Sequence, residues 1–151
     1  MLTIAYILTG IAAFFFMEFF AWFLHKFVMH GFMWNWHKDH HIPHNKTLEK
    51  NDRFVILFAL PGLALLAAGV YLTSSFMLAA GIGVSAYGFA YFLFHDVYVH
   101  QRIKLPVADN RYLRATKEAH EDHHRPHSSQ NFGFLLAPIS YYLKAYSKTK
   151  K

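Results

Sequence analysis

Residues 54–94 read FVILFALPGLALLAAGVYLTSSFMLAAGIGVSAYGFAYFLF, and this stretch decides the fold. It contains two apolar segments, at about residues 54–72 and 76–94, with only Thr73, Ser74 and Ser75 between them. A helix of this length reaches roughly 28 Å, enough to cross a hydrocarbon core of about 30 Å with little tilt. A segment that crosses lipid alone must be helical, because its backbone polar groups have no water to bond. We therefore predict a tight transmembrane helical hairpin.

A third apolar segment covers about residues 2–24. We interpret it as a retained span and not as a cleaved signal peptide, because it lacks a basic start and carries Glu18. Hydrophobic residues make up 54% of the 151 residues and charged ones only 16%. Three such segments leave too little polar chain to cover them in water. The sequence predicts an all-α, multi-span integral membrane protein with a single domain over residues 1–151.

The basic residues are confined to two blocks. Five of the 15 Lys and Arg lie between Lys26 and Arg53, and the other ten lie between Arg102 and Lys151. With a hairpin between them, both blocks lie on one side of the membrane, and the positive-inside rule makes that side cytoplasmic. The net charge of +6 is therefore expected to meet lipid headgroups, and nucleic acid is not expected as a partner.

A fourth apolar stretch, at about residues 132–143, has 12 residues and is too short for a comfortable span. Crossing there would also carry the basic C-terminal tail to the outside. We predict an interfacial or re-entrant segment, with the C-terminus cytoplasmic.

The chain has no Cys, which excludes disulfides, thiolate metal sites and Cys nucleophiles, but it has 12 His. The His form a repeat. HKFVMH at 25–30 is followed by HKDHHIPH at 37–44, and HDVYVH at 95–100 is followed by HEDHHRPH at 120–127. Each copy is an H-x4-H motif followed by an H-x2-H-H motif. This repetition, starting where a span ends, indicates a metal site just beneath the membrane surface, in a cytoplasmic His-rich cap.

Helical geometry supports the motif H-x2-H-H as a metal-binding face. At 100° per residue its three imidazoles fall within an arc of about 100°. The H-x4-H pairs turn by about 140°, so they either flank the centre or lie on a helix with a local bulge. Ten His match the two motifs and are the predicted ligands of two metal ions: His25, His30, His37, His40, His41, His95, His100, His120, His123 and His124.

The ligand type leaves the metal open, because imidazole suits zinc, copper, iron and nickel. The paired Glu-x-x-His motifs of di-iron carboxylate bundles are lacking, since only Glu121 with His124 fits that spacing. We favour a nitrogen-rich di-iron centre that activates O₂, with zinc as the alternative. No catalytic residue beyond the metal centre and no other cofactor site is expected.

Five further residues are candidates for orienting the ligand imidazoles from outside: His44, His127, Asp39, Asp122 and Glu18. A carboxylate that accepts the second ring N–H of a ligand fixes its tautomer. The simpler interpretation makes the two His surface groups and makes Glu18 a helix-interface or snorkelling residue.

The order of these motifs resembles the fatty acid hydroxylase/sterol desaturase superfamily of His-box di-iron membrane oxygenases. More narrowly, the chain resembles bacterial β-carotene 3-hydroxylases. That similarity is carried by residues 25–31, Asn51-Asp52, residues 95–102 and Phe132-Gly-Phe-Leu-Leu-Ala-Pro138, and it extends from about Met17 to Pro138.

The resemblance implies a monooxygenase of carotenoid biosynthesis. The ten His would bind two iron ions, and O₂ would be the co-substrate. A hydroxyl would be inserted at C3 of each β-ionone ring, converting β-carotene through β-cryptoxanthin to zeaxanthin. Because the chain has no flavin, haem or ferredoxin motif, electrons would come from a separate ferredoxin or similar reductase. In the absence of a transit-like leader we expect a bacterial inner (plasma) membrane.

Two alternatives remain open. One is another membrane lipid hydroxylase or desaturase, acting on a fatty acid or a sterol with the same di-iron site. The other is a non-enzymatic membrane protein that binds or transports metal. Transport would need ligands along a pore, yet only the first span carries a charged residue or a His before its cytoplasmic end.

Overall fold

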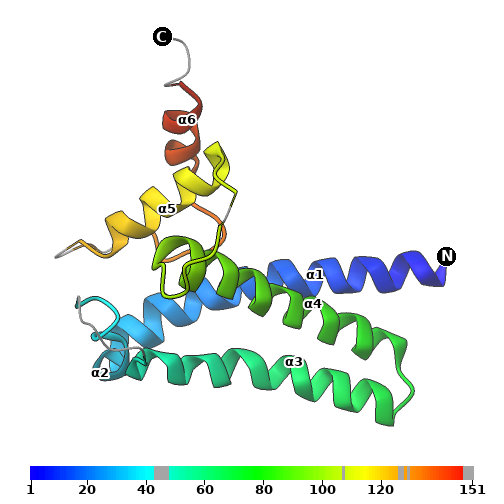
Figure 1. The fold of residues 1–151 in the computed structure, drawn as a ribbon. Coiled ribbons are helices and arrows are strands. Elements are labelled where there is room, and N and C mark those ends of the chain that lie inside the picture. Colours follow the sequence, from blue (N-terminus) through cyan, green and yellow to red (C-terminus); the bar gives the residue numbers. More distant parts are fainter. Residues whose placement is uncertain (43–47, 107, 126–127, 129, 148–151) are drawn as a thin grey trace.

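The computed structural model describes residues 1–42, 48–106, 108–125, 128 and 130–147, and every regular element in that part is helical (Figure 1). The all-α prediction is confirmed. The helices are α1 (Leu2–Phe23), η1 (Leu24–Phe32), α2 (Trp34–His37), η2 (Lys50–Arg53), α3 (Phe54–Tyr71), α4 (Ser75–Phe92), η3 (Leu93–Val99), α5 (Arg111–His123) and α6 (Ile139–Ser147).

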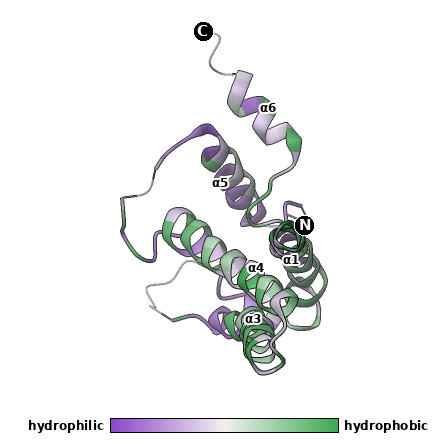
Figure 2. Cartoon of the chain, turned by 90° about the vertical axis from the view of Figure 1, so that its right-hand side faces the viewer, coloured by the Kyte–Doolittle hydropathy of each residue, from purple (hydrophilic) through white to green (hydrophobic). Residues whose placement is uncertain are grey.

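Three helical stretches are long and apolar enough to cross a membrane: Leu2–Phe32, Lys50–Tyr71 and Ser75–Val99. Their bounds agree with the predicted apolar segments within a few residues, although the first and third helices continue past the predicted ends as η1 and η3, and membrane crossing stays a prediction. Helix α4 packs against both α1 and α3. Figure 2 shows the apolar character of these three helices beside the hydrophilic α5.

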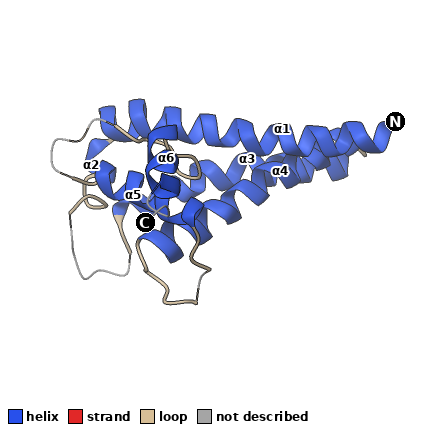
Figure 3. Ribbon diagram, turned by 90° about the horizontal axis from the view of Figure 1, so that it is seen from above, coloured by secondary structure: helices blue, strands red, loops and turns tan. Residues whose placement is uncertain are grey.

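The polar elements gather at one end of this bundle. Figure 3 shows α2 and α5 at the end away from the N-terminus, as a His-rich cap requires. At the opposite end, Thr73 adopts a φ of 51° and the Ser74 hydroxyl accepts the N–H of Met77, which starts α4. The predicted tight turn at residues 73–75 is therefore confirmed.

A buried apolar core lies near the cap. It consists of Met17, Ala21, Val84, Tyr87 and Phe134. Four of these residues come from α1 and α4, and the last comes from the non-helical segment before α6. This core fixes the C-terminal segment against α1 and α4, which continue directly into η1 and η3, where the first His of each repeat lies.

The stretch that was predicted as one segment, residues 132–143, divides in two. Residues 132–138 are not helical, and α6 begins at Ile139 and packs on α5. In Figure 1 α6 points away from the three long helices. The apolar side chains of Ile139 and Leu143 are exposed. The placement of this segment at a membrane interface stays a prediction.

Helices α1 and α4 approach closely because two Gly face each other. A Cβ added to Gly83 would lie 2.1 Å from the carbonyl oxygen of Gly10, whereas a Cβ added to Gly88 would meet no atom within 4 Å. Small residues permit this kind of close packing between helices in membranes. The backbone contact sets the distance between the two helices that lead to the His.

We expect Gly83→Ala to lower the free energy of unfolding by about 1–3 kcal/mol, because the added methyl group must push α1 and α4 apart. Gly88→Ala, in the same helix, is the matched control and should leave stability unchanged or slightly raised. Thermal unfolding in detergent micelles measures both. Equal midpoints for the two variants would contradict the close contact.

Candidate metal centre

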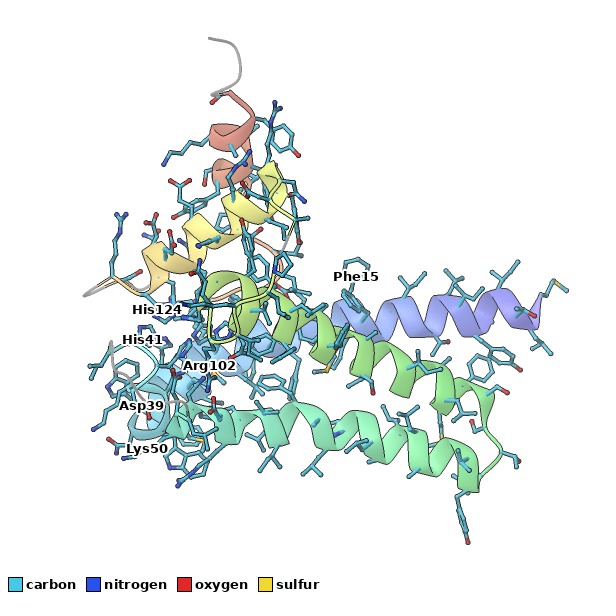
Figure 4. The ribbon with its side chains drawn as sticks, viewed as in Figure 1. Phe15, Asp39, His41, Lys50, Arg102 and His124 are labelled. Atoms are coloured by element: carbon cyan, nitrogen blue, oxygen red, sulfur yellow. The ribbon has the colours of Figure 1, made fainter. Side chains whose placement is uncertain are left out.

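Ten His from both halves of the chain come together at the cap end of the bundle. Figure 4 shows two of them, His41 and His124, next to each other there, while Phe15 lies farther along α1. The ten comprise two His on η1, two on η3 or directly after it, three at and after the end of α2, and three at the end of α5. Segments that are far apart in sequence therefore meet at one site.

Both H-x4-H motifs lie on π-helical turns. The N–H of His100 bonds the carbonyl of His95 at 2.9 Å, an i→i+5 bond. This winding brings residues five apart onto one face of the helix. The ring centroids of His25 and His30 are 5.0 Å apart, and those of His95 and His100 are 4.5 Å apart. The local bulge, one of the two predicted arrangements, is the one that forms.

The two H-x2-H-H motifs differ in backbone. The second lies on α5 and its C-cap residue, as predicted. The first does not stay helical, because His37 ends α2 and the following residues form turns, such as the bond from His40 N–H to His37 O at 3.0 Å. The helical prediction is wrong beyond His37. The tighter turns nevertheless keep the three rings together.

The ligand atoms fall into two groups, each within 4.8 Å. Group 1 contains His25, His30, His37, His41 and His123, and group 2 contains His40, His95, His100 and His120. Each H-x2-H-H motif is thus divided between the groups, so its three imidazoles do not all belong to one group. The ring of His124 stacks on His41 at 4.3 Å and lies 4.6 Å from that of His120, so it lies between the groups.

Backbone carbonyls hold two rings of group 1 from outside. His25 donates its Nδ1–H to the carbonyl of Phe132 at 2.9 Å, and His123 donates its Nδ1–H to the carbonyl of Gln130 at 2.8 Å. A carbonyl oxygen can only accept, so the proton of each neutral ring is on Nδ1. The Nε2 atoms therefore carry free lone pairs.

Side chains hold two more rings. His37 Nδ1 lies 2.7 Å from Asn51 Oδ1, and His40 Nδ1 lies 2.8 Å from Glu49 Oε2. Such partners orient metal-binding imidazoles and raise their basicity. From the sequence, Asn51 stands out only as part of the family resemblance, and Glu49 is not predicted. The feature of the sequence that could have indicated Asn51 and Glu49 is their position on the short connection between the first His motifs and the second span.

The inner nitrogens of group 1 lie close together. The Nε2 atoms of His25 and His37 are 3.0 Å apart, although both rings carry their proton on Nδ1. A cation bound between these two lone pairs would remove their repulsion. Two imidazole nitrogens at about 2.1 Å from one divalent ion, at right angles, are about 3 Å apart. The donor set of group 1 therefore fits a metal ion.

Group 2 shows the same spacing. The Nε2 atoms of His40 and His95 are 3.1 Å apart, as are those of His100 and His120. The buried Nε2 of His124 has no hydrogen-bond partner within the described part of the chain. A second ion fits this group, with His124 near enough to add a donor.

Burial keeps these rings neutral. It lowers the pKa of His37 and of His41 to about 3, and the neighbouring His add to the shift. It also lowers the pKa of His100 to about 2 and that of His120 well below the ordinary value. A neutral imidazole is the form that binds metal, so the rings need not lose a proton at neutral pH.

The structure gives two of the predicted orienting residues other partners. Asp39 accepts the backbone N–H of Lys50 at 2.7 Å, and both residues are labelled in Figure 4. Asp122 accepts the hydroxyl hydrogen of Tyr141 at 2.8 Å and pairs with Arg125. Their hydrogen bonds thus brace the cap. The other two predicted residues of this kind, His44 and His127, lie outside the described residues.

Glu18 also makes its bonds away from the imidazoles. Its buried carboxylate accepts the hydroxyl hydrogen of Tyr87 and the backbone N–H groups of Phe134, Leu135 and Leu136. The simpler expectation of a helix-interface residue describes only the bond to Tyr87.

An ion-pair network supports group 2. Arg102, labelled in Figure 4, makes two bonds to Asp52, at 2.7 and 2.8 Å, and one to Asp96 at 2.8 Å. Asp96 Oδ2 in turn lies 3.5 Å from His95 Nδ1. The bidentate geometry of a guanidinium with a carboxylate adds directional strength. This network ties η2, directly before α3, to η3.

With this site in place, the class of protein is settled by comparison. Residues 10–143 match the family described as Fatty acid hydroxylase, and the chain belongs to that family.

Among its relatives is a beta-carotene hydroxylase of Pantoea ananas, which is 38% identical over 129 residues; the match covers 81% of this chain and 71% of that protein. Another is a beta-carotene hydroxylase of Paracoccus sp. (strain PC1), which is 38% identical over 127 residues; this match covers 81% of this chain and 78% of that protein. Beta-carotene 3-hydroxylase 1, chloroplastic, of Arabidopsis thaliana is 37% identical over 127 residues, 81% of this chain, but the match covers only 41% of that protein. No solved structure matches the chain.

We expect Asn51→Ala to weaken metal binding about 10- to 100-fold, because His37 loses the acceptor that fixes its ring. Asn35→Ala is the control, since Asn35 is exposed on α2 and only two residues from His37. Competition with a chelator, starting from metal-loaded protein, measures both affinities. A parent-like affinity in Asn51→Ala would show that this bond does not orient a ligand.

Proposed function

We propose that the protein is a membrane monooxygenase that hydroxylates carotenoids at C3 of the β-ionone ring, converting β-carotene through β-cryptoxanthin to zeaxanthin. The observation that carries this proposal is the pair of His groups at one end of an apolar helical bundle, in a chain of the fatty acid hydroxylase family. The relatives named as beta-carotene hydroxylases support the substrate class.

We assign two iron ions to the site, one to group 1 and one to group 2 with His124. The bound irons would supply O₂ activation, which an unactivated ring C–H requires because it has no acidic proton for a side-chain base. Electrons would come from a separate ferredoxin or similar reductase.

The protein's own part is to orient the imidazoles and to exclude water. His25, His37 and His120 are each at most 2% exposed. The ring of Phe134 stacks on that of His25 at 4.7 Å and covers the inner side of the site. A dry, rigid ligand set limits side reactions of the kind that water causes.

A lipid substrate can approach from the bilayer side. Phe19, Phe23 and Phe27 are exposed along α1 and η1 on the way to the His groups. A carotenoid dissolved in the membrane would contact this aromatic surface. The surface extends along α1 to η1, where His25 lies.

We further propose a multi-pass protein of a bacterial inner membrane, with the His site and the C-terminus cytoplasmic and residues 1–151 acting as one domain. The support is the distribution of charge: no Lys or Arg lies in residues 1–25 or 54–101, and the cap carries both basic blocks. Anionic headgroups are the expected lipid partners of the basic tail.

Expression in bacteria that make β-carotene tests the function. We expect zeaxanthin from the parent chain and none from His123→Ala, which removes a ligand of group 1. Glu121→Ala is the control, because Glu121 lies on the same helix with a side chain that is 58% exposed. Chromatography of extracted pigments is the measurement.

Unchanged β-carotene beside a folded, iron-loaded parent and a working reductase would contradict the carotenoid assignment. Oxygenated fatty acids or sterols would then identify another lipid oxygenase. Metal binding without any oxygen-dependent product would identify a metal-binding protein.

A further inference from the structure

The non-helical segment of residues 130–136 connects an acid inside the first span to the His groups. It passes between α1 and the end of α5, and it has contacts on two sides. One side faces Glu18, and the other faces the ligand rings.

On the Glu18 side, the contacts are hydrogen bonds from three successive backbone N–H groups. Oε1 accepts from Phe134 at 3.1 Å and from Leu136 at 2.9 Å, and both carboxylate oxygens lie 3.1 Å from the nitrogen of Leu135. Glu18 is 7% exposed. Consecutive N–H groups that converge in this way form an anion-binding nest.

On the His side, two carbonyls and one ring make the contacts. Gln130 and Phe132 accept the Nδ1–H of His123 and His25, as described above. The Phe134 ring stacks on that of His25 with an interplanar angle of 18°. Phe134 therefore donates its backbone N–H to Glu18 and also packs its ring on His25.

The buried carboxylate depends on the segment for most of its hydrogen bonds, and its other bond is from the Tyr87 hydroxyl. A charged side chain within a span is costly unless protein groups satisfy it. The three N–H bonds satisfy Glu18, and in return they fix the backbone within two residues of Phe132. At Gly133 a Cβ would lie 2.5 Å from the Leu136 carbonyl oxygen and 3.3 Å from Glu18 Oε1, so the turn has no room for a side chain.

We propose that Glu18 is a positioning residue for the metal centre: its carboxylate holds segment 130–136 so that the carbonyls of Phe132 and Gln130 fix the rings of His25 and His123. The inference rests on the proposed metal centre. It assigns to Glu18 an action through the backbone and not through direct contact with a ligand.

The test compares Glu18→Gln with the parent in micelles. The Gln amide keeps the shape and one carbonyl oxygen, but it loses the negative charge and places an NH₂ group beside the N–H of Leu135, so the segment should loosen. In metal-free protein we expect the ¹⁵N signals of His25 and His123 to change from the Nδ1–H tautomer to a mixture. In metal-loaded protein we expect one of two ions to be lost at about tenfold lower chelator concentration.

Two further variants separate positioning from a purely structural role. Tyr87→Phe removes the bond between Glu18 and α4, at 2.8 Å, but leaves the N–H bonds to the segment. It should match the parent in both measurements. Gly133→Ala displaces the segment while Glu18 stays, so it should reproduce the effect of Glu18→Gln.

Parent-like tautomers and metal retention in Glu18→Gln would overturn the proposal. Equal effects of Glu18→Gln and Tyr87→Phe would overturn it too, because Glu18 would then act only as a tie between α1 and α4. A parent that binds no metal would refute the metal centre instead, and the tautomer comparison would still decide the positioning role. If Glu18→Gln does not fold, Glu18→Asp, whose shorter side chain draws the carboxylate away from the segment, takes its place in the same comparison with Tyr87→Phe.

Discussion

A buried neutral imidazole has one nitrogen that must donate and one that must accept, and the cap is organised around this constraint. In group 1 the donating nitrogens point outward to fixed oxygens, as at His25 and His123. The accepting nitrogens consequently point inward, as at the facing Nε2 atoms of His25 and His37. The outer hydrogen bonds thus leave an inner surface of lone pairs that suits a cation.

The oxygen atoms that accept the outer hydrogen bonds of the rings come from segments that are far apart in the sequence. Asn51 and Glu49 precede α3, and the carbonyls of Gln130 and Phe132 belong to the segment before α6. The first two are held in turn through their neighbour Asp52, which accepts the backbone N–H of Glu49 and pairs with Arg102. The rigidity of the ligand rings therefore depends on the packing of the whole cap.

The sequence predicted those parts of the structure that depend on composition and spacing. The three spans follow from apolar length, and the ten His follow from two repeated motifs. The division of each H-x2-H-H motif between two groups was not predictable, because it depends on where η1 and η3 bring their rings. The acceptor at His123 is a backbone carbonyl, which every residue has, so no residue type marks it. Glu18 was visible as an acid in a span, but its backbone partners, residues 134–136, lie more than a hundred residues away.

The division of the motifs has a consequence for how the centre forms. His40 lies between His37 and His41 in sequence, yet it belongs to the other group, and His120 and His123 are separated in the same way. Residues 37–41 form a short segment with rings in both groups. A shift of this segment that adjusts the rings of one group therefore also shifts a ring of the other. Metal binding also couples to folding wherever the ligand set is incomplete in the unfolded chain. Ordering of one group therefore prepares the other, and residues 130–136 contribute to both: their carbonyls hold rings of group 1, and the Phe134 ring contacts His95 of group 2.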